Sequence, residues 1–352
     1  MAVQRAAIIS YRLGGADGVS IEAAKWAAAL ERLGLAVDLV AGEPADGVTV
    51  VTGIGISEDG PVDMDQLERA LGAADVVIVE NLCSLPLNPM AGKAVASVLH
   101  GRPAVLRHHD LAWHRRDTKA LGGPPDDPAW RHVTINHLFA EELAQHGIEA
   151  TVLYNRFDMD PPPGRRAATR QLIGVGEGQL LAVQPTRALP RKNVPGGLAL
   201  AEALSATYWL TAAAEDGYGD ELATILQSAH ASVIRGQGPG TMDDVYAAAD
   251  FVVLPSIWEG FGNPVIESVT HHRPLALGDY PVAAEIRAMG FEFFSSTDPA
   301  TLRRFLEAPD DDLLERNHVR ARARFDLADL PAEIDQVLDL VVPDRARPEG
   351  GR

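Results

Sequence analysis

Short apolar runs alternate with amphipathic helical patterns along almost the whole chain, and this alternation limits the possible folds more than any other feature. In the first half, the pattern predicts strands at residues 6–10, 35–40, 48–52, 75–80, 104–107, 132–136 and 151–154. It predicts helices between several of them, at residues 19–32, 64–71, 90–99 and 138–145. Strands that alternate with helices indicate parallel βαβ units and a doubly wound sheet.

A proline-rich break divides the pattern in two. Residues 157–166 read FDMDPPPGRR, and three consecutive prolines neither continue a helix nor fit a central strand. The alternation then restarts, with strands predicted at residues 180–184, 208–212, 231–234, 251–254, 275–277 and 291–294, helices at 196–204, 220–228 and 243–249, and a helical tail over 311–341. We therefore predict two α/β domains facing a cleft, residues 1–158 and 159–342, and a disordered tail at 343–352.

Length and charge narrow the class of protein. A chain of 352 residues suits two domains, and a net charge of -18 argues against nucleic acid and anionic membranes as partners. The single cysteine, Cys83, excludes an intramolecular disulfide and fits a reducing cytoplasm. No apolar run approaches the roughly 18 residues of a membrane span. We expect a cytoplasmic protein without stable membrane association, and the sequence does not indicate its oligomeric state.

The run FVVLPSIWEGFGNPVIES, residues 251–268, has the strongest chemical pattern. A buried strand leads into a loop with Gly260 and Gly262, which allow the backbone to approach a ligand closely. Asn263 is a good N-cap and Pro264 a good first residue for the helix that follows. The N-terminus of that helix would offer free N–H groups and a positive dipole to an anion.

The same run resembles a family. Glu259 and Glu267 have the E-x7-E spacing of retaining glycosyltransferases of the GT-B type, family 4, within the EGFG-NP-VIES pattern typical of them. Upstream, QPTRALPRKN (residues 184–193) resembles the loop in which that family carries an arginine and, five residues later, a lysine. Arg187 and Lys192 hold these places. A guanidinium grips phosphate oxygens in a bidentate manner, and an ammonium supplies a point charge.

Weaker matches follow in the expected order along nearly the whole chain. VLRHHDL (residues 105–111) resembles a strand that ends in the family's His-Asp pair, and RLGGADG (12–18) resembles the glycine-rich turn after the first strand. VIRGQGP (233–239) resembles the segment beside the nucleobase, and YNRFD (154–158) the segment at the domain junction. The sequence departs from the family at Arg156, at Arg235 and over residues 270–277.

The resemblance implies a two-domain GT-B fold and transfer of a sugar from a nucleoside diphosphate sugar, most often UDP or GDP linked, with retention of configuration. It implies no cofactor and no dedicated metal. The predicted catalytic residues are His109, Arg187, Lys192 and Glu259. The predicted donor-binding residues are Gly14, Gly15, Arg187, Lys192, Arg235, Gly236, Glu259, Gly260, Phe261, Gly262, Asn263 and Glu267, and the predicted acceptor-binding residues are Arg107, His108 and Asp110.

Several alternatives remain open at this stage. The arginines at positions 102, 107, 115 and 116 are either a solvated face or a site for an anionic acceptor. The histidines at 100, 108, 109 and 114 fit no named zinc motif. A dehydrogenase would need the spacing G-x-G-x-x-G after the first strand, which RLGGADG does not supply. A catalytically inactive relative that only binds a nucleotide sugar is the main alternative to an active transferase.

Overall fold

The computed structural model describes residues 3–115, 122–215, 217–236, 238 and 240–343. It divides into two compact units, of which unit 1 comprises residues 1–156 and 328–352 and unit 2 comprises residues 157–327. Each unit is a parallel sheet with helices on its faces, so the prediction of two doubly wound α/β domains of the GT-B type is confirmed. No helix among the described residues is long and apolar enough to span a membrane.

The sheet of unit 1 has seven strands in the order β3-β2-β1-β4-β5-β6-β7, all paired in parallel. The strands are β1 (Arg5–Ser10), β2 (Ala36–Ala41), β3 (Val48–Val50), β4 (Val76–Glu80), β5 (Ala104–His108), β6 (Trp130–Thr134) and β7 (Ala150–Val152). The central strands β4 and β5 are buried along their whole length, as expected of parallel strands that helices cover on both faces.

The helices of unit 1 that follow the sequence pattern are α1 (Gly18–Arg32), α2 (Met64–Gly72), α3 (Pro89–Leu99) and α4 (His137–Gln145). Each begins after an Asp or Asn whose side chain accepts a hydrogen bond from the first turn, namely Asp17, Asp63, Asn88 and Asn136. These caps satisfy N–H groups that have no partner within the helix. Helices α2 and α3 pack their apolar residues against β1, β4 and β5.

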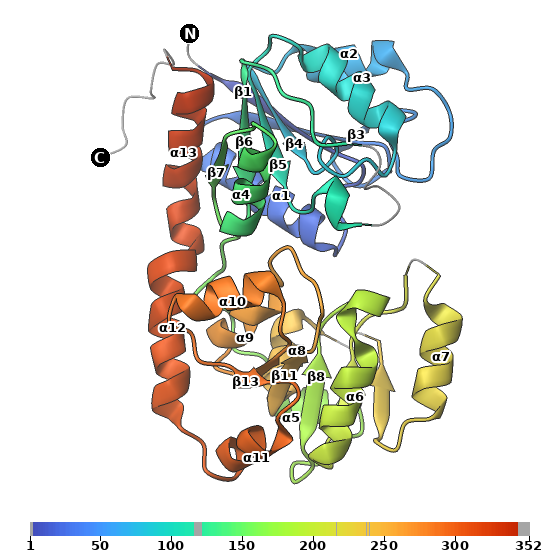
Figure 1. Ribbon diagram of the computed structural model, residues 1–352, viewed down its shortest axis with the longest axis vertical. Coiled ribbons are helices and arrows are strands. Elements are labelled where there is room, and N and C mark those ends of the chain that lie inside the picture. Colours follow the sequence, from blue (N-terminus) through green and yellow to red (C-terminus); the bar gives the residue numbers. More distant parts are fainter. Residues whose placement is uncertain (1–2, 116–121, 216, 237, 239, 344–352) are drawn as a thin grey trace. The chain divides into compact units, whose positions relative to one another are not determined.

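The C-terminal helical tail departs from the predicted grouping. Its first helix, α12 (Asp311–Phe325), belongs to unit 2, whereas α13 (Leu330–Val341) belongs to unit 1 and packs against α1 (Figure 1). A short 3-10 turn, Leu327–Asp329, separates the two helices, and Pro331 starts α13 because proline fits only the first turn of a helix. Arg156, which departs from the family pattern, forms an ion pair with Glu333 of α13. Of the tail predicted to be disordered, residues 344–352 lie outside the described residues.

The sheet of unit 2 has six strands in the order β10-β9-β8-β11-β12-β13, again all parallel. The strands are β8 (Leu181–Gln184), β9 (Thr207–Leu210), β10 (Val233–Arg235), β11 (Phe251–Leu254), β12 (Leu275–Leu277) and β13 (Phe294–Ser295). Strand β13 covers only the end of the strand predicted at residues 291–294, because Phe291 and Phe293 stack on one another outside the sheet.

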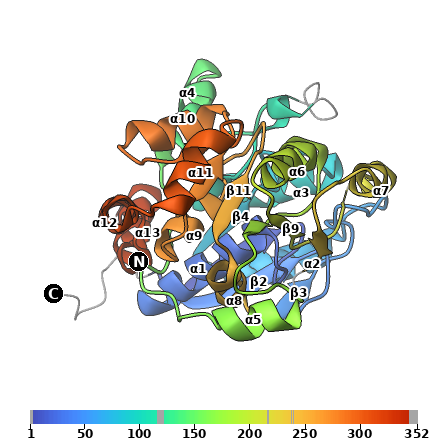
Figure 2. The ribbon, with the colours of Figure 1, turned by 90° about the horizontal axis from the view of Figure 1, so that it is seen from below.

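Helices cover both faces of this second sheet. They are α5 (Arg166–Leu172), α6 (Val194–Ala203), α7 (Gly219–Gln227), α8 (Met242–Ala248), α9 (Pro264–Thr270), α10 (Pro281–Ala288) and α11 (Pro299–Glu307). Figure 2 shows α6 and α11 on one side of the strands and α5 and α8 on the other. Two separate apolar cores correspond to these two sides, one with α6, α7 and α11 and one with α8 and the segment that follows α5.

In both sheets the strand order reverses beside the first strand. Strand β1 lies between β2 and β4, and β8 lies between β9 and β11. In open parallel sheets, ligands bind beyond the carboxyl ends of the strands at such a switch point, because the loops there diverge and leave a crevice. A ligand is therefore expected at the loops after β8 and β11 in unit 2 and after β1 and β4 in unit 1.

Candidate functional site

The two motifs of unit 2 meet at its switch point. The loop after β8 ends in a 3-10 turn, Pro190–Lys192, and the loop after β11 carries Glu259. The Nζ atom of Lys192 lies 2.5 Å from Oε1 of Glu259, and Nη1 of Arg191 lies 2.7 Å from Oε2. The Oγ atom of Ser256 donates to Oε1 of Glu259 at 2.6 Å. One carboxylate thus joins the two loops.

Backbone contacts hold this arrangement. Asn193 follows Lys192 with a φ of 50°, a left-handed conformation that asparagine tolerates better than most residues. Its Nδ2 donates to the carbonyl oxygen of Pro255 at 3.1 Å, and the N–H of Ile257 donates to the carbonyl of Arg191 at 2.9 Å. Two hydrogen bonds thus join the loops in addition to the contacts of Glu259.

The charges at this junction do not balance. Lys192 and Glu259 are 8% and 4% exposed. Burial raises the pKa of Glu259, but Lys192 and Arg191 more than offset it, so the pKa lies below its usual value. Burial lowers the pKa of Lys192 despite the attraction of Glu259, and Arg191 and Arg187 act in the same direction. Positive groups therefore outnumber the carboxylate that they share, and a further anion would be favoured there.

Arg187, the second predicted phosphate contact, is more exposed. Its Nη1 lies 2.5 Å from Oε2 of Glu215, and the two side chains are 32% and 40% exposed. An ion pair at that exposure contributes little free energy. The guanidinium is thus held in place by a weak partner that a bound anion could replace.

Glu267 occupies the first turn of α9, as predicted. Its Oε2 accepts a hydrogen bond from the hydroxyl of Tyr246 at 2.5 Å. The Tyr246 ring stacks on His271 at 4.6 Å, and Nε2 of His271 lies 3.1 Å from Asp243. The ring of Tyr246 is buried, so the position of the Glu267 carboxylate is set by the packing of α8 against α9.

In the loop after β11, Gly262 has a backbone that requires glycine, whereas Asn263 does not cap the helix with its side chain as predicted. Gly262 has a φ of 87°, and an added Cβ would lie 2.8 Å from the hydroxyl of Tyr280, so a larger residue would not fit. Gly260 is partly exposed. Pro264 is the first residue of α9. Among the described residues, the first turn of α9 donates no hydrogen bond to the Asn263 side chain, because the backbone of Asn263 is itself helical, with φ -44° and ψ -40°.

Two further predicted donor contacts lie elsewhere in unit 2. The Phe261 ring is buried against Phe157 and Phe325, with ring centroids 5.9 and 5.7 Å apart, so the side chain belongs to the core of unit 2. Arg235 is exposed at the end of β10. Gly236 follows with a φ of 90°, and its carbonyl accepts from Nε1 of Trp209 at 2.7 Å.

The predicted glycine-rich turn of unit 1 lies between β1 and α1. Gly14 has a φ of 75°, and an added Cβ would come within 2.9 Å of Cβ of Ala45. An added Cβ on Gly15 would lie 3.2 Å from Oδ2 of Asp17, the residue that caps α1. The turn itself therefore favours glycine at position 14, where φ is positive, whereas position 15 is only tightly packed against the Asp17 side chain.

A buried charge network lies beside them, at the ends of β4 and β5. Nη1 of Arg107 lies 2.6 Å from Oε1 of Glu80, and Nε2 of His109 lies 2.6 Å from Oε2. Burial raises the pKa of Glu80, but Arg107 and His109 outweigh it and lower the pKa overall. The guanidinium carbon of Arg107 lies 4.2 Å from the ring centroid of Trp26, a cation–π contact. Glu80 thus fixes the imidazole of His109.

The turn that carries the His-Asp pair is held from β4. Asn81 has a φ of 61°, and its Oδ1 accepts from the N–H groups of His109 and Asp110 at 3.1 and 3.0 Å. Oδ2 of Asp110 accepts from Nε of Arg115 at 2.9 Å. The side chain of Asp110 is 15% exposed and that of His109 8%, so both remain accessible in part.

The structure does not support acceptor contacts for Arg107 or His108. Both side chains are enclosed, Arg107 under Trp26 and His108 against His132. Nε2 of His108 lies 2.9 Å from Nδ1 of His132, and burial lowers the pKa of His108 well below its usual value. As successive residues of β5 they face opposite sides of the sheet, and each is enclosed on its own side, a register that the sequence motif does not reveal.

The arginine-rich segment is engaged internally as well. Nη2 of Arg102 donates to the carbonyl of Leu71 at 2.7 Å, and Arg115 binds Asp110. Arg116 lies outside the described residues. Every arginine of this segment that the structure describes therefore has a partner within unit 1, which weakens the case for an anion site built from them.

Sequence reasoning missed several residues of these sites. Arg191 directly precedes Lys192 in the sequence. Its position beside a predicted phosphate-binding lysine could have indicated that it belongs to the site. Glu80, Asn81 and Ser256 gave no signal, since each acts on a residue brought close only by the pairing of strands or loops. Tyr246 reads as an ordinary apolar position of a helix.

Solved structures that resemble this chain in fold include glycosyltransferases. The chain superposes on HepE of Anabaena in complex with UDP and glucose with a TM-score of 0.74, at 17% identity, covering 96% of this chain and 99% of that one. WaaG, a glycosyltransferase of lipopolysaccharide biosynthesis, gives 0.66 at 15% identity, covering 94% and 99%. At these identities the likeness establishes the fold. No family model matches the chain.

The chain is a nucleotide-sugar-dependent glycosyltransferase of the GT-B fold, as its sequence motifs predict, and those motifs resemble the ones of family 4. Among curated proteins it is similar to the mannosylglucosylglycerate synthase of Thermotoga maritima, with 26% identity in an alignment 381 residues long. The alignment covers 88% of this chain and 89% of that enzyme. It is 25% identical to the enzyme of the same name from Petrotoga mobilis, over 84% of this chain and 87% of the relative.

Proposed function

We propose that the chain transfers a hexosyl group from a UDP- or GDP-sugar to a small carboxylated acceptor, with retention at the anomeric carbon and without a metal ion in the transfer step. The observation that carries this proposal is the shared carboxylate of Glu259, bound by Lys192 and Arg191 at the switch point of unit 2. Two chain segments with the spacing of the family's donor motifs meet there, and the cations outnumber the anion.

The leaving diphosphate would supply the missing negative charge. In the proposed mechanism Lys192 and Arg187 bind the diphosphate oxygens, and Arg187 releases the weakly held Glu215 to do so. Charge on the diphosphate grows as the glycosidic bond breaks, so groups fixed in advance stabilise the transition state more than the ground state. Burial of Lys192 strengthens this effect because few water molecules screen it.

The two glutamates take separate roles in this proposal. Glu267, placed by Tyr246, accepts hydrogen bonds from the ribose hydroxyls, and Arg235 and Gly236 border the base. Glu259 keeps Lys192 in place and faces the transferred sugar together with the backbone of Gly260. Each assignment follows from the match to the family motif, and the geometry is compatible with it.

The acceptor is proposed from the relatives and from unit 1. The similar enzymes are named for mannosylglucosylglycerate, whose glycerate part is a small carboxylate. In unit 1, His109 is oriented by Glu80 and remains partly accessible, which suits a hydrogen bond to a sugar hydroxyl. Asp110 is the other accessible polar group on this turn.

The proposal is tested by a transfer assay on the purified protein. UDP-, GDP-, ADP- and dTDP-sugars are first ranked by thermal shift, because a ligand that binds the native state raises the melting temperature. The best donor is then offered with glucosylglycerate and, as the matched uncharged acceptor, with glucosylglycerol. We expect transfer to the carboxylated acceptor in clear preference. Donor binding without transfer or hydrolysis for any acceptor would instead identify an inactive, nucleotide-sugar-binding relative.

A further inference from the structure

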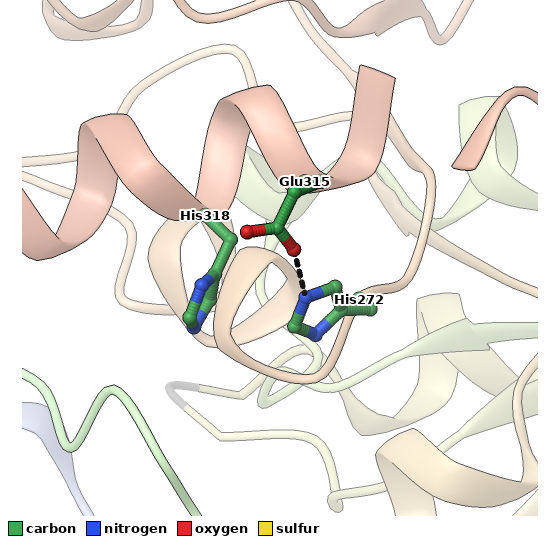
Figure 3. A group of neighbouring side chains, drawn as sticks. All are labelled: His272, Glu315 and His318. Atoms are coloured by element: carbon green, nitrogen blue, oxygen red, sulfur yellow. Dashed lines mark hydrogen bonds and ion pairs between the residues drawn. The ribbon is translucent and has the colours of Figure 1, made fainter. Parts of the chain in front are cut away.

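Two histidines and a glutamate of unit 2 converge away from the loops described above. His272 follows α9, and Glu315 and His318 lie one turn apart on α12 (Figure 3). One ligand atom from each of the three side chains lies within 4.8 Å of the other two. Imidazole nitrogens with one carboxylate oxygen form a donor set that suits zinc.

The hydrogen bond of His318 fixes which of its nitrogens is available. Its Nε2 lies 2.8 Å from the carbonyl oxygen of Met159. A carbonyl oxygen only accepts, so Nε2 carries the proton and Nδ1 of the neutral ring keeps a lone pair. Histidines that bind metals commonly donate their other N–H to a backbone carbonyl, which orients the ring. His318 is 7% exposed, so the surrounding residues hold its ring in this orientation.

His272 has a backbone conformation that an ordinary surface residue seldom adopts. Its φ is 50°, in the left-handed region that favours glycine. A residue other than glycine in this backbone conformation costs free energy, which interactions with the surrounding structure have to offset. The conformation directs the imidazole toward α12, and its ring centroid lies 4.5 Å from that of His318.

The contacts within the group do not by themselves explain the arrangement. Nε2 of His272 lies 3.3 Å from Oε2 of Glu315, a long distance for a charge-assisted hydrogen bond. The two side chains are 46% and 61% exposed, and exposed pairs of this kind contribute little. The nearby guanidinium of Arg316 is paired with Glu292 at 3.4 Å, so its charge is partly neutralised.

We propose that Nε2 of His272, a carboxylate oxygen of Glu315 and Nδ1 of His318 bind one divalent transition-metal ion, zinc by preference, that ties α9 to α12. Zinc–nitrogen distances of about 2.0–2.1 Å place tetrahedral ligands roughly 3.4 Å apart. The side chains of His272 and Glu315 are 46% and 61% exposed, so a change of rotamer that closes the remaining distance would not disturb the core of unit 2. A water molecule completes the coordination, since three side chains leave the fourth position open.

The consequence of such an ion is mechanical rather than catalytic. Helix α9 carries Glu267 near its start, and His272 comes two residues after its last residue, Thr270. An ion that joins this end to α12 stabilises the folded unit by binding it and not the unfolded chain. The inference is independent of the proposed transfer chemistry.

The test uses the full chain without a polyhistidine tag, stripped of metal with EDTA and then dialysed. Zn²⁺ is titrated by calorimetry, and Co²⁺ by visible absorption, which reports nitrogen and oxygen ligands around the ion. We expect one saturable equivalent and a rise in melting temperature with Zn²⁺. His272→Ala and Glu315→Gln should each weaken binding by at least about tenfold, whereas His230→Ala, which changes an exposed histidine outside the group, should leave it unchanged.

Folding does not confound the result, because the two substituted side chains are exposed and the metal-free melting temperature of each variant checks its integrity. The proposal fails if Zn²⁺ shows no saturable binding to the wild-type chain. It fails equally if the double variant His272→Ala, Glu315→Gln binds Zn²⁺ with unchanged affinity and the same rise in melting temperature.

Discussion

The ammonium of Lys192 and the carboxylate of Glu259 are 2.5 Å apart, although 67 residues separate them in the chain. Each lies on the loop that follows one of two adjacent strands, β8 and β11, which are neighbours in the sheet. Their contact links the two motifs by which the sequence resembles glycosyltransferases. Lys192 and Arg191 together carry one more positive charge than the Glu259 carboxylate neutralises. The predictions for the donor site follow from this excess positive charge.

Replacing Lys192 should slow transfer strongly. Lys192→Ala removes a preorganised charge that would stabilise the leaving diphosphate, and the loss of one such group costs roughly 2.7–4 kcal/mol, about 10²–10³ in rate. The value is read from kcat/KM with saturating acceptor. Lys93→Ala, which removes an exposed lysine of α3, is the matched control and should match wild type. A Lys192→Ala rate within twofold of wild type would rule out the assignment.

The two glutamates should fail in different kinetic parameters. Glu267 is proposed to bind ribose, which is remote from the bond that breaks, so its hydrogen bonds stay similar in the ground and transition states. Removing such uniform binding raises KM and leaves kcat nearly unchanged. We therefore expect Glu267→Ala to act mainly through the KM for the donor, as steady-state kinetics at varied donor concentration will show.

Glu259 is expected to act mainly through kcat, since it both faces the transferred sugar and holds Lys192 in place. Glu259→Gln is preferred to alanine because it keeps the shape of the side chain. Even so, removal of a buried counter-charge destabilises proteins by about 3–5 kcal/mol, so the folded state is checked by its melting temperature. If both glutamate variants changed the same parameter by the same factor, their separate roles would be wrong.

Chelation should leave transfer intact. The proposed mechanism assigns the diphosphate charge to Lys192 and Arg187 and not to a metal ion. We expect the initial rate at 25 °C to be the same before and after EDTA treatment, while the melting temperature falls if the ion proposed at His272 is removed. Activity that EDTA abolishes and Mg²⁺ or Mn²⁺ restores would falsify the metal-independent mechanism.

Much of the fold could be predicted because its strands are local, continuous apolar runs and its helices begin at recognisable caps. The strand Phe251–Leu254 is wholly buried, and the loop with Gly260 and Gly262 follows it. The strand, the loop and the helix could therefore all be predicted from this one segment of sequence. The position of α13 could not be predicted, because α13 follows α12 of unit 2 along the chain but packs against α1, at the other end of the sequence, in unit 1.

The part of the site that the sequence could not reveal depends on strand order. Arg107 reads as an available cation, yet β5 pairs with β4 and places it on Glu80. His108 was predicted to bind the acceptor, yet its side chain meets His132 of β6. In both cases the deciding contact is with a neighbouring strand, and no spacing within the motif encodes it.

The stability of unit 1 should fall as the pH drops below about 6.5, because of the histidine pair. Nε2 of His132 lies 3.1 Å from a carboxylate oxygen of Asp126. Because a carboxylate only accepts hydrogen bonds, the proton of the neutral His132 ring is on Nε2, and Nδ1 presents its lone pair to His108. His108 then donates from Nε2. Its Nδ1 is buried and has no hydrogen-bond partner among the described residues, so protonating it is unfavourable.

The sign of the effect follows from linkage. Burial places the pKa of His108 well below that of an unfolded histidine, about 6.5. Above that pH both states are neutral there, and below it the unfolded chain takes up a proton that the native state does not. The free energy of unfolding therefore decreases with falling pH, by up to about 1.4 kcal/mol per pH unit for one proton. His108→Gln, whose amide can still donate to His132, should flatten this dependence between pH 6.5 and 5. His230→Gln should retain the wild-type slope, and equal slopes for His108→Gln and wild type in urea unfolding would refute the account.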